Sequence, residues 1–200
     1  MELQHILNEA SNKAISYKQY RDLVQAHANK GTNSGRAFSE LLATYTVFND
    51  QLMERLDNTL KISPENQRFL SNFKKEVYFL IITESWCGDA AQTMPMMNQV
   101  ARASGVDFKV VLRDQNLELI DSFLTNGGRS IAKLILVDAN TNLPMATWGP
   151  RPTKATQLVA EEKAAKGLLS TEFKQELQNW YNKDKGKDTE NDLVEMLRAI

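Results

Sequence analysis

The chain has 200 residues, 24 of them basic and 25 acidic, which gives a net charge of −1 with 42% hydrophobic residues. A chain of this length buries about 70% of its surface on folding, enough for one sizeable hydrophobic core. Because the charge is balanced, neither nucleic acid nor an anionic membrane surface is expected as a partner. The single cysteine, Cys87, excludes an intrachain disulfide, a Cys-x-x-Cys dithiol and cysteine-built metal centres. With only two histidines besides, we expect no metal and no cofactor.

The amino-terminal segment carries no targeting signal that the sequence pattern reveals. The first twenty residues are polar throughout and lack the run of about 7–15 apolar residues typical of a signal peptide. The longest apolar run, over residues 77–82, is too short to cross a membrane. We therefore expect a soluble, cytoplasmic protein with no membrane partner, in a compartment that suits a free thiol.

Residues 1–72 are interpreted as a helical extension. Apolar residues recur at helical spacing from Leu3 to Val24, and Gly31 ends the run. A second stripe predicts one long amphipathic helix, on the spacing of Leu41, Leu42, Tyr45, Phe48, Leu52, Leu56 and Leu60. Ser63 and Pro64 are typical of a helix start and predict a short helix to about residue 72. We expect the apolar stripe of the extension to pack on the domain that follows.

Residues 73–200 show alternating strand and helix patterns. The continuous apolar run over 77–82 indicates a central strand covered on both faces. Further strands are expected over 106–112, 133–137 and 144–148. Helices are expected over 89–104, 116–124, 153–166, 170–183 and 189–200, the last two joined by a solvated connection. The pattern predicts an α/β fold, with a central mixed sheet of about four strands and helices on both faces.

Cys87 lies between the strand over 77–82 and the helix over 89–104. A thiol there lies beside unpaired backbone N–H groups and the positive end of a helix dipole, and both favour the thiolate. The carboxylate of Asp89, two residues later, opposes ionisation if it is close to the sulfur. We predict a depressed pKa for Cys87. The alternative is a buried structural cysteine that acts as a small hydrophobic residue.

The sequence Trp86-Cys87-Gly88-Asp89-Ala90 after a hydrophobic strand resembles the active-site turn of the thioredoxin superfamily, Trp-Cys-Gly-Pro-Cys. Pro95, eight residues after the cysteine, matches the proline that kinks this helix in thioredoxins. The segments ESWCGDA, GGRSI and Trp148-Gly-Pro-Arg-Pro152 are similar to those of a bacterial thioredoxin-like group with an amino-terminal helical extension. The resemblance implies a thioredoxin-like domain over residues 73–200.

Three departures from the thioredoxin pattern argue against dithiol exchange. Ala90 stands where the resolving cysteine is expected, and Ile81 stands where thioredoxin has a buried carboxylate. Ala132 replaces the proline whose cis bond faces the active site. Because a non-proline cis bond costs about 2.5–4 kcal/mol, we expect a trans bond before Ala132. The resemblance then implies single-thiol exchange, in which Cys87 forms a mixed disulfide with a protein or low-molecular-weight thiol that an external thiol such as glutathione resolves.

The resemblance places six residues around Cys87, in contact with substrate or with the thiol: Trp86, Gly88, Asp89, Ile131, Ala132 and Arg151. Arg151 is expected either to stabilise a thiolate or an anionic substrate, or to be an ordinary solvated arginine. Arg129 is a weaker candidate of the same kind, and Glu84 is a weak candidate proton acceptor. The competing interpretation is a non-catalytic thioredoxin-fold module. Such a module would bind a partner through the cleft around Trp86 and Ala132 and through the helical face.

Overall fold

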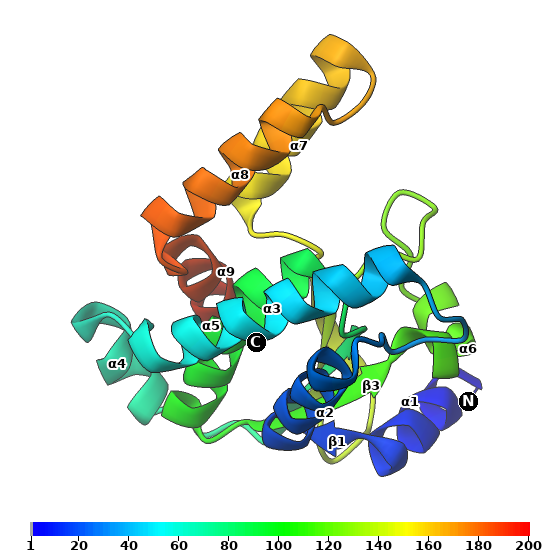
Figure 1. Ribbon diagram of the computed structural model, residues 1–200. Coiled ribbons are helices and arrows are strands. Elements are labelled where there is room, and N and C mark those ends of the chain that lie inside the picture. Colours follow the sequence, from blue (N-terminus) through cyan, green and yellow to red (C-terminus); the bar gives the residue numbers. More distant parts are fainter. Residues whose placement is uncertain (1) are drawn as a thin grey trace.

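The structure, a computed structural model, describes residues 2–200 and forms one mixed sheet flanked by helices (Figure 1). The strands are β1 (Ile15–Ser16), β2 (Val77–Thr83), β3 (Asp107–Leu112), β4 (Lys133–Asp138) and β5 (Pro144–Trp148). The helices are α1 (Glu2–Lys13), α2 (Tyr17–Lys30), α3 (Glu40–Thr59), α4 (Pro64–Ser71), α5 (Gly88–Ser104), α6 (Leu117–Asp121), α7 (Thr153–Lys166), α8 (Thr171–Asp184) and α9 (Lys187–Arg198), with a short 3-10 turn at Arg113–Gln115. The predicted α/β class is confirmed. Within residues 2–200, none of the helices combines the length and apolar character that a membrane crossing needs.

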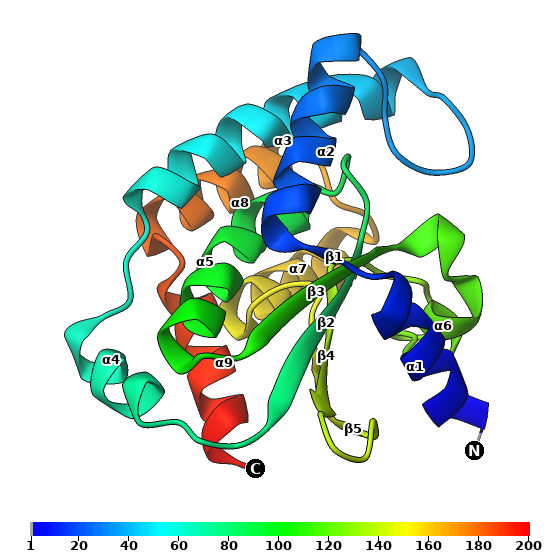
Figure 2. The same ribbon diagram turned by 90° about the horizontal axis from the view of Figure 1, so that it is seen from below.

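The sheet has the strand order β1-β3-β2-β4-β5. Strand β2 pairs in parallel with β3, and β4 runs antiparallel to both β2 and β5. All seven residues of β2 are buried, as its continuous apolar run predicts. Figure 2 shows α5 and α9 on one side of the sheet and α1 and α6 on the other. Cys87 lies shortly after β2 in the chain, and all residues of this strand are buried.

A fifth strand, β1, comes from the extension and was not expected. Ile15 pairs with Val110 of β3, in antiparallel register. Ser16 ends this strand and caps α2, because its Oγ accepts from the Gln19 N–H while the Gln19 side chain accepts from the Ser16 N–H. The helical pattern from Leu3 to Gly31 is thus interrupted by a capping box. Part of the extension belongs to the sheet itself, and the division of the chain at residue 72 stays a prediction.

Helix α3 presents a different face to the core from the one that its apolar spacing predicts. Three residues of the predicted stripe are largely exposed: Leu41, Tyr45 and Phe48. The buried residues are Ala43, Thr46, Asn49 and Met53. The prediction is wrong for the first half of this helix because Thr46 and Asn49 hydrogen-bond to the buried Ser85, which an apolar side chain cannot do.

The connection between α8 and α9 is also shorter and more buried than predicted. Helix α8 ends at Asp184 and α9 begins at Lys187, so little of the expected solvated connection is present. Glu190, 2% exposed, accepts hydrogen bonds from the backbone N–H of Ser63 (3.0 Å), the Oγ of Ser63 (2.6 Å) and the Nδ2 of Asn66 (2.8 Å). This carboxyl group joins α9 to the start of α4. Figure 1 shows that α7 and α8 form a hairpin that projects from the body of the molecule.

We predict that Glu190→Ala lowers the free energy of unfolding by about 2–4 kcal/mol, because one buried donor and two partly buried donors lose their acceptor. Chemical denaturation monitored by circular dichroism measures the change. Glu195→Ala, in the same helix, removes only a side chain that is 70% exposed and paired with Arg198. That control is expected to change stability by no more than about 0.5 kcal/mol, and equal effects of the two substitutions would contradict the assigned role of Glu190.

Candidate functional site around Cys87

Cys87 occupies the N-cap position of α5, directly after the turn that follows β2. Its Sγ donates a hydrogen bond to the carbonyl oxygen of Ile131 at 3.2 Å and accepts one from the Ala90 N–H at 3.4 Å. The residue is only 6% exposed. The structure therefore brings together Cys87 and the Ile131–Ala132 segment, which lie far apart in the sequence.

Burial raises the pKa of the Cys87 thiol to about 12, and the nearby Asp89 carboxylate acts in the same direction. The N–H groups of Ala90 and Asp89 and the charge of Arg151 lower the pKa, but they are outweighed. The predicted depressed pKa is wrong because loss of solvent around the sulfur exceeds the stabilisation that the helix N-terminus gives a thiolate. The alternative that Cys87 is a buried, protonated cysteine fits this environment.

The peptide bond between Ile131 and Ala132 is cis, where a trans bond was expected. The expectation rested on the trans preference of a non-proline peptide bond in isolation. In the structure this bond is buried, and tertiary contacts surround it. Ala132 is fully buried, and a Cβ atom on the facing Gly149 would lie 2.2 Å from the Ala132 carbonyl oxygen. Gly149 also has a φ of +108°, so glycine is required there for both reasons.

Asp89 and Arg151, both predicted to lie near the thiol, form an ion pair with each other. Arg151 Nη2 lies 2.7 Å from Asp89 Oδ2, and the hydroxyl of Tyr181 donates to Asp89 Oδ1 at 3.4 Å. Burial raises the pKa of Asp89, although Arg151 opposes this shift. The charge of Arg151 is largely directed at Asp89 rather than at the sulfur. The Nε of Arg151 is buried and has no hydrogen-bond partner within the part of the chain that the structure describes.

Trp86 is half-buried and is held by contacts that the sequence did not indicate. Its Nε1 donates to the carbonyl oxygen of Ser34 at 3.2 Å. The guanidinium carbon of Arg113 lies 4.9 Å from the centre of the indole ring, and Arg113 also pairs with Asp114 at 2.8 Å. These partners come from distant segments, and no local motif connects them with Trp86.

Five buried polar residues fix the end of β2, and we refer to them as the polar cluster: Ser34, Thr46, Asn49, Glu84 and Ser85. Ser34 and Ser85 exchange two hydrogen bonds between backbone N–H and side-chain Oγ, at 2.9 and 2.8 Å. Thr46 Oγ1 lies 2.9 Å from Ser85 Oγ, and Asn49 Nδ2 donates to the Ser85 carbonyl at 2.9 Å. The cluster ties the loop before α3, and α3 itself, to the residues that precede Cys87.

Glu84 belongs to this polar cluster, where it binds Ser34 and the backbone of Asp114 rather than the thiol. Its carboxylate accepts from the Ser34 hydroxyl and from the Asp114 N–H at 2.9 Å. Burial raises its pKa. Arg129, the weaker arginine candidate, is half-exposed and forms an ion pair with Asp121 at 2.6 Å. Glu84 contacts Cys87 through its backbone carbonyl, which accepts from the Cys87 N–H at 3.1 Å, while its carboxylate is bound elsewhere.

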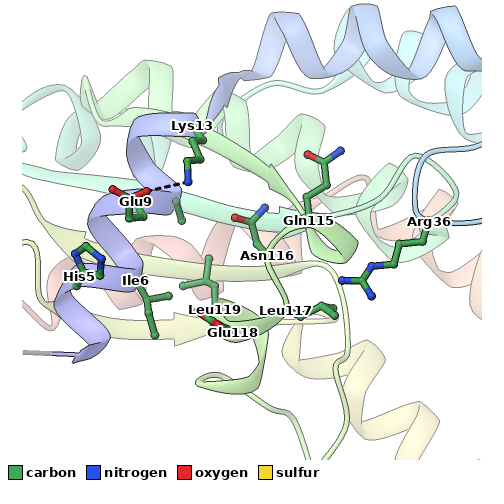
Figure 3. Close-up of a pocket in the computed structure, with 11 residues that line it drawn as sticks. His5, Ile6, Glu9, Lys13, Arg36, Gln115, Asn116, Leu117, Glu118 and Leu119 are labelled. Atoms are coloured by element: carbon green, nitrogen blue, oxygen red, sulfur yellow. Dashed lines mark hydrogen bonds and ion pairs between the residues drawn. The ribbon is translucent and has the colours of Figure 1, made fainter.

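An open cavity of about 820 Å³ lies between α3, the start of α5 and α8, and we call it the α3–α8 cavity. Gly88 is exposed, and together with Trp86, Asp89 and Arg151 it lines this space. The sequence interpretation missed the lining residues from α8 because its helical pattern gives no indication of what that helix faces. A separate cavity of about 530 Å³, between α1 and residues 115–119, contains none of the predicted site residues (Figure 3).

We predict that alkylation of Cys87 in the folded protein shows no midpoint below about pH 10, since the pKa of the thiol is raised to about 12. The rate of reaction with iodoacetamide, measured from pH 6 to 10, checks this, with urea-unfolded protein as the control at a midpoint of about 8.5. The same shift means that the thiol contributes fully to stability below about pH 8.5 and that this contribution is lost as the pH rises. A folded-state midpoint at or below 8.5 would contradict the assignment.

We predict that Ser34→Ala destabilises the protein by about 2–3 kcal/mol, because the buried Ser85 N–H loses its acceptor and Glu84 loses a donor. The substitution is also expected to speed alkylation of Cys87, since the segment before it is less firmly held. Urea denaturation and the alkylation rate measure the two effects. Ser122→Ala, which removes an exposed hydroxyl that binds within its own helix, is the matched control and is expected to change neither.

Comparison with known proteins shows the family of the chain. A family model described as Thioredoxin matches residues 35–165, more than half of the chain. The 1.5 Å crystal structure of a protein of unknown function from Pseudomonas aeruginosa superposes with a TM-score of 0.65 at 11% identity, with 96% of each chain covered. An HIV epitope-scaffold superposes with a TM-score of 0.59 at 12% identity, over 93% of this chain and 99% of that one.

The search of curated proteins finds no match. At 11% and 12% identity the two structural likenesses show the fold alone. The family match begins at residue 35, within the predicted extension, and covers Cys87, Ala132 and Arg151. The chain belongs to the thioredoxin family.

Proposed function

We propose that the protein is a non-catalytic member of the thioredoxin family that binds a partner beside Trp86. The observation that carries the proposal is the state of the sole thiol. Cys87 is 6% exposed, and burial raises its pKa to about 12. Ala90 stands in place of a resolving cysteine, so a mixed disulfide has no second thiol within the chain to release it.

The direction of the shift in the pKa of Cys87 supports binding over exchange. A thiol whose pKa is raised is ionised at pH 7 in a smaller fraction of molecules than an unperturbed cysteine, for which the fraction is about 3%. A more basic thiolate is a better nucleophile, but with a Brønsted coefficient of about 0.5 this offsets only part of the loss. Cys87, which is also buried, is then expected to react more slowly than a free thiol.

The surface available for binding differs from the predicted cleft. Ile131 and Ala132 are buried, so they offer little to a partner. Gly88 is exposed and Trp86 is half-buried, and both residues line the α3–α8 cavity. Phe48, 61% exposed, lines the same cavity. The partner-binding surface that the geometry supports is therefore the α3–α8 cavity.

The second candidate function is single-thiol exchange, and one observation favours it. The sulfur caps α5 and accepts from the Ala90 N–H, a position in which a thiolate, once formed, is stabilised. In that reaction the Cys87 proton passes to solvent and the thiolate attacks a disulfide. One new S–S bond forms as the old one breaks and a thiolate leaves, after which an external thiol releases Cys87.

We predict that the wild-type protein and Cys87→Ser give the same rate in a glutathione-coupled disulfide reduction assay. The expected reason is that a buried, protonated thiol does not react within a turnover. Glutathionylation of Cys87 by oxidised glutathione, followed by mass spectrometry at pH 7, is expected to be slower than that of free cysteine. Faster reaction than free cysteine, together with loss of turnover in Cys87→Ser, would replace the binding proposal by single-thiol exchange.

A further inference from the structure

Helix α3 carries a row of apolar side chains that the rest of the chain, over residues 2–200, leaves largely uncovered. The row consists of Leu41, Tyr45, Phe48 and Leu52, and we call it the exposed α3 row. The first three are 61%, 46% and 61% exposed, and Leu52 is half-buried. Leu41 lies outside the lining of the α3–α8 cavity, so the row continues past the cavity towards the start of the helix. An apolar patch of this kind on a folded chain typically marks an interaction surface.

The spacing of the exposed α3 row indicates that a second helix covers it. Successive members are four, three and four residues apart. Alternating steps of three and four residues are the pattern by which one helix packs against another in a coiled coil. Helix α3 already presents a different face, which includes Thr46 and Met53, to the body of its own chain. Figure 2 shows α3 at the periphery of the molecule, with α2 and α5 on its inner side.

The same spacing is self-complementary. Steps of four, three and four residues read the same from either end of the helix, and their midpoint lies between Tyr45 and Phe48. In an antiparallel pair of α3 helices, Leu41 of each copy therefore lies opposite Leu52 of the other, and Tyr45 lies opposite Phe48. Each copy then contributes the same surface, and the two-fold axis passes between Tyr45 and Phe48. A contact of this symmetry is complete with two copies.

The flanks of the exposed α3 row carry no charge that opposes this pairing. On the solvent side of the row the neighbouring side chains are Thr44 and Gln51, both exposed and uncharged. In the antiparallel pair Thr44 of one copy lies near Gln51 of the other, and a hydroxyl and an amide can hydrogen-bond there. Glu54 comes nine residues after Tyr45, which is about two and a half helical turns, so it faces away from the row.

The charged residues at the two ends of the row favour antiparallel over parallel pairing. Arg55 is exposed and lies seven residues after Phe48, so it continues the row at the carboxyl-terminal end. Its Nη2 donates to the uncharged side chain of Asn182 at 3.0 Å. Glu40, also exposed, lies at the amino-terminal end. In a parallel pair the two Arg55 side chains would face each other, whereas an antiparallel pair places each beside the end that carries Glu40.

The exposed apolar area is suited to a weak dimer. At roughly 200 Å² for a large side chain, the exposed fractions of Leu41, Tyr45 and Phe48 amount to about 340 Å² in each copy and about 700 Å² in a pair. This apolar part alone falls below the total of about 1,200–2,000 Å² that stable interfaces bury. The dimer is therefore expected to be weak and to depend on the concentration of the protein.

We propose that the protein forms a weak antiparallel dimer in which the exposed α3 rows of two copies pack against each other. The inference rests on the proposed function, because Tyr45, Phe48 and Leu52 line the α3–α8 cavity, and it names the partner as a second copy of this chain. Cys87 is buried and does not line the cavity, so the dimer needs no disulfide between the copies.

Sedimentation velocity of the full chain in a reducing buffer, from about 5 to 500 µM, tests whether the weak dimer forms. Wild type and Cys87→Ser are both expected to change from monomer to dimer as the concentration rises. Phe48→Glu and Tyr45→Lys are each expected to weaken the dimer at least tenfold, because a symmetric dimer contains each substitution twice. Leu143→Glu, at a side chain that is 48% exposed and lies outside α3, is the matched control and is expected to leave the dimer unchanged.

A mixture of the two variants tests the antiparallel register. In the proposed pairing, Tyr45→Lys on one copy places its ammonium opposite the carboxylate of Phe48→Glu on the other, and the second contact keeps Phe48 opposite Tyr45. The equimolar mixture is therefore expected to dimerise at least tenfold more tightly than either variant alone. Parallel pairing would give no such recovery. Both side chains are exposed, so far-UV circular dichroism and thermal unfolding are expected to match wild type.

Three results would overturn the inference: a wild-type chain that stays monomeric at the highest concentration, equal effects of Phe48→Glu and Leu143→Glu, or a mixture that does not recover the dimer. If the chain is monomeric and the thiol is also slow in exchange, a second copy is the wrong partner and the binding function stands. Rapid exchange at Cys87 would refute the proposed function, whatever sedimentation gives.

Discussion

The end of strand β2 is polar and yet buried, and the need to pair its polar groups is the constraint on which the site depends. Glu84 and Ser85 are at most 1% exposed, in a region from which water is excluded. Their hydrogen bonds come from Ser34, from Thr46 and Asn49 of α3, and from the backbone N–H of Asp114. Unpaired, these groups would cost several kcal/mol. Residues 1–72 therefore contribute to the site, since Ser34, Thr46 and Asn49 supply partners for these buried groups.

This pairing has two consequences for the chemistry of the site. It holds the segment before α5 so that Cys87 turns its sulfur towards the Ile131 carbonyl, where burial governs the pKa of the thiol. It also sets the orientation of α3 about the helix axis, because the face that carries Thr46 and Asn49 must be the buried one. The apolar residues Tyr45 and Phe48 are then left on the outside, where they form a wall of the α3–α8 cavity. The hydrogen bonds of the polar cluster thus help to hold Cys87 in a buried position, and they leave apolar side chains of α3 exposed beside it.

Where the sequence predicted correctly, the information was local. The apolar run of β2, the start of α4 at Ser63 and Pro64, and the bounds of α7 follow from neighbouring residues and appear as expected. The motif around Cys87 predicted its position between a strand and a helix, and the family resemblance predicted that Ile131, Ala132 and Arg151 lie near Cys87. The contacts of Cys87 with Ile131 and of Asp89 with Arg151 agree with that arrangement.

The sequence by itself determined the fold class, the presence of one thiol at the start of a helix and the absence of a resolving cysteine. Only the tertiary structure decided the sign of the pKa shift, the cis bond before Ala132 and the buried face of α3. The helix N-terminus that favours a thiolate is a local feature, readable from neighbouring residues. Desolvation depends on everything that covers the sulfur, and at Cys87 that cover includes Ile131, which is distant in sequence. Periodicity likewise reports which residues of α3 share a face, but the hydrogen bonds of Ser85 select the face that is buried.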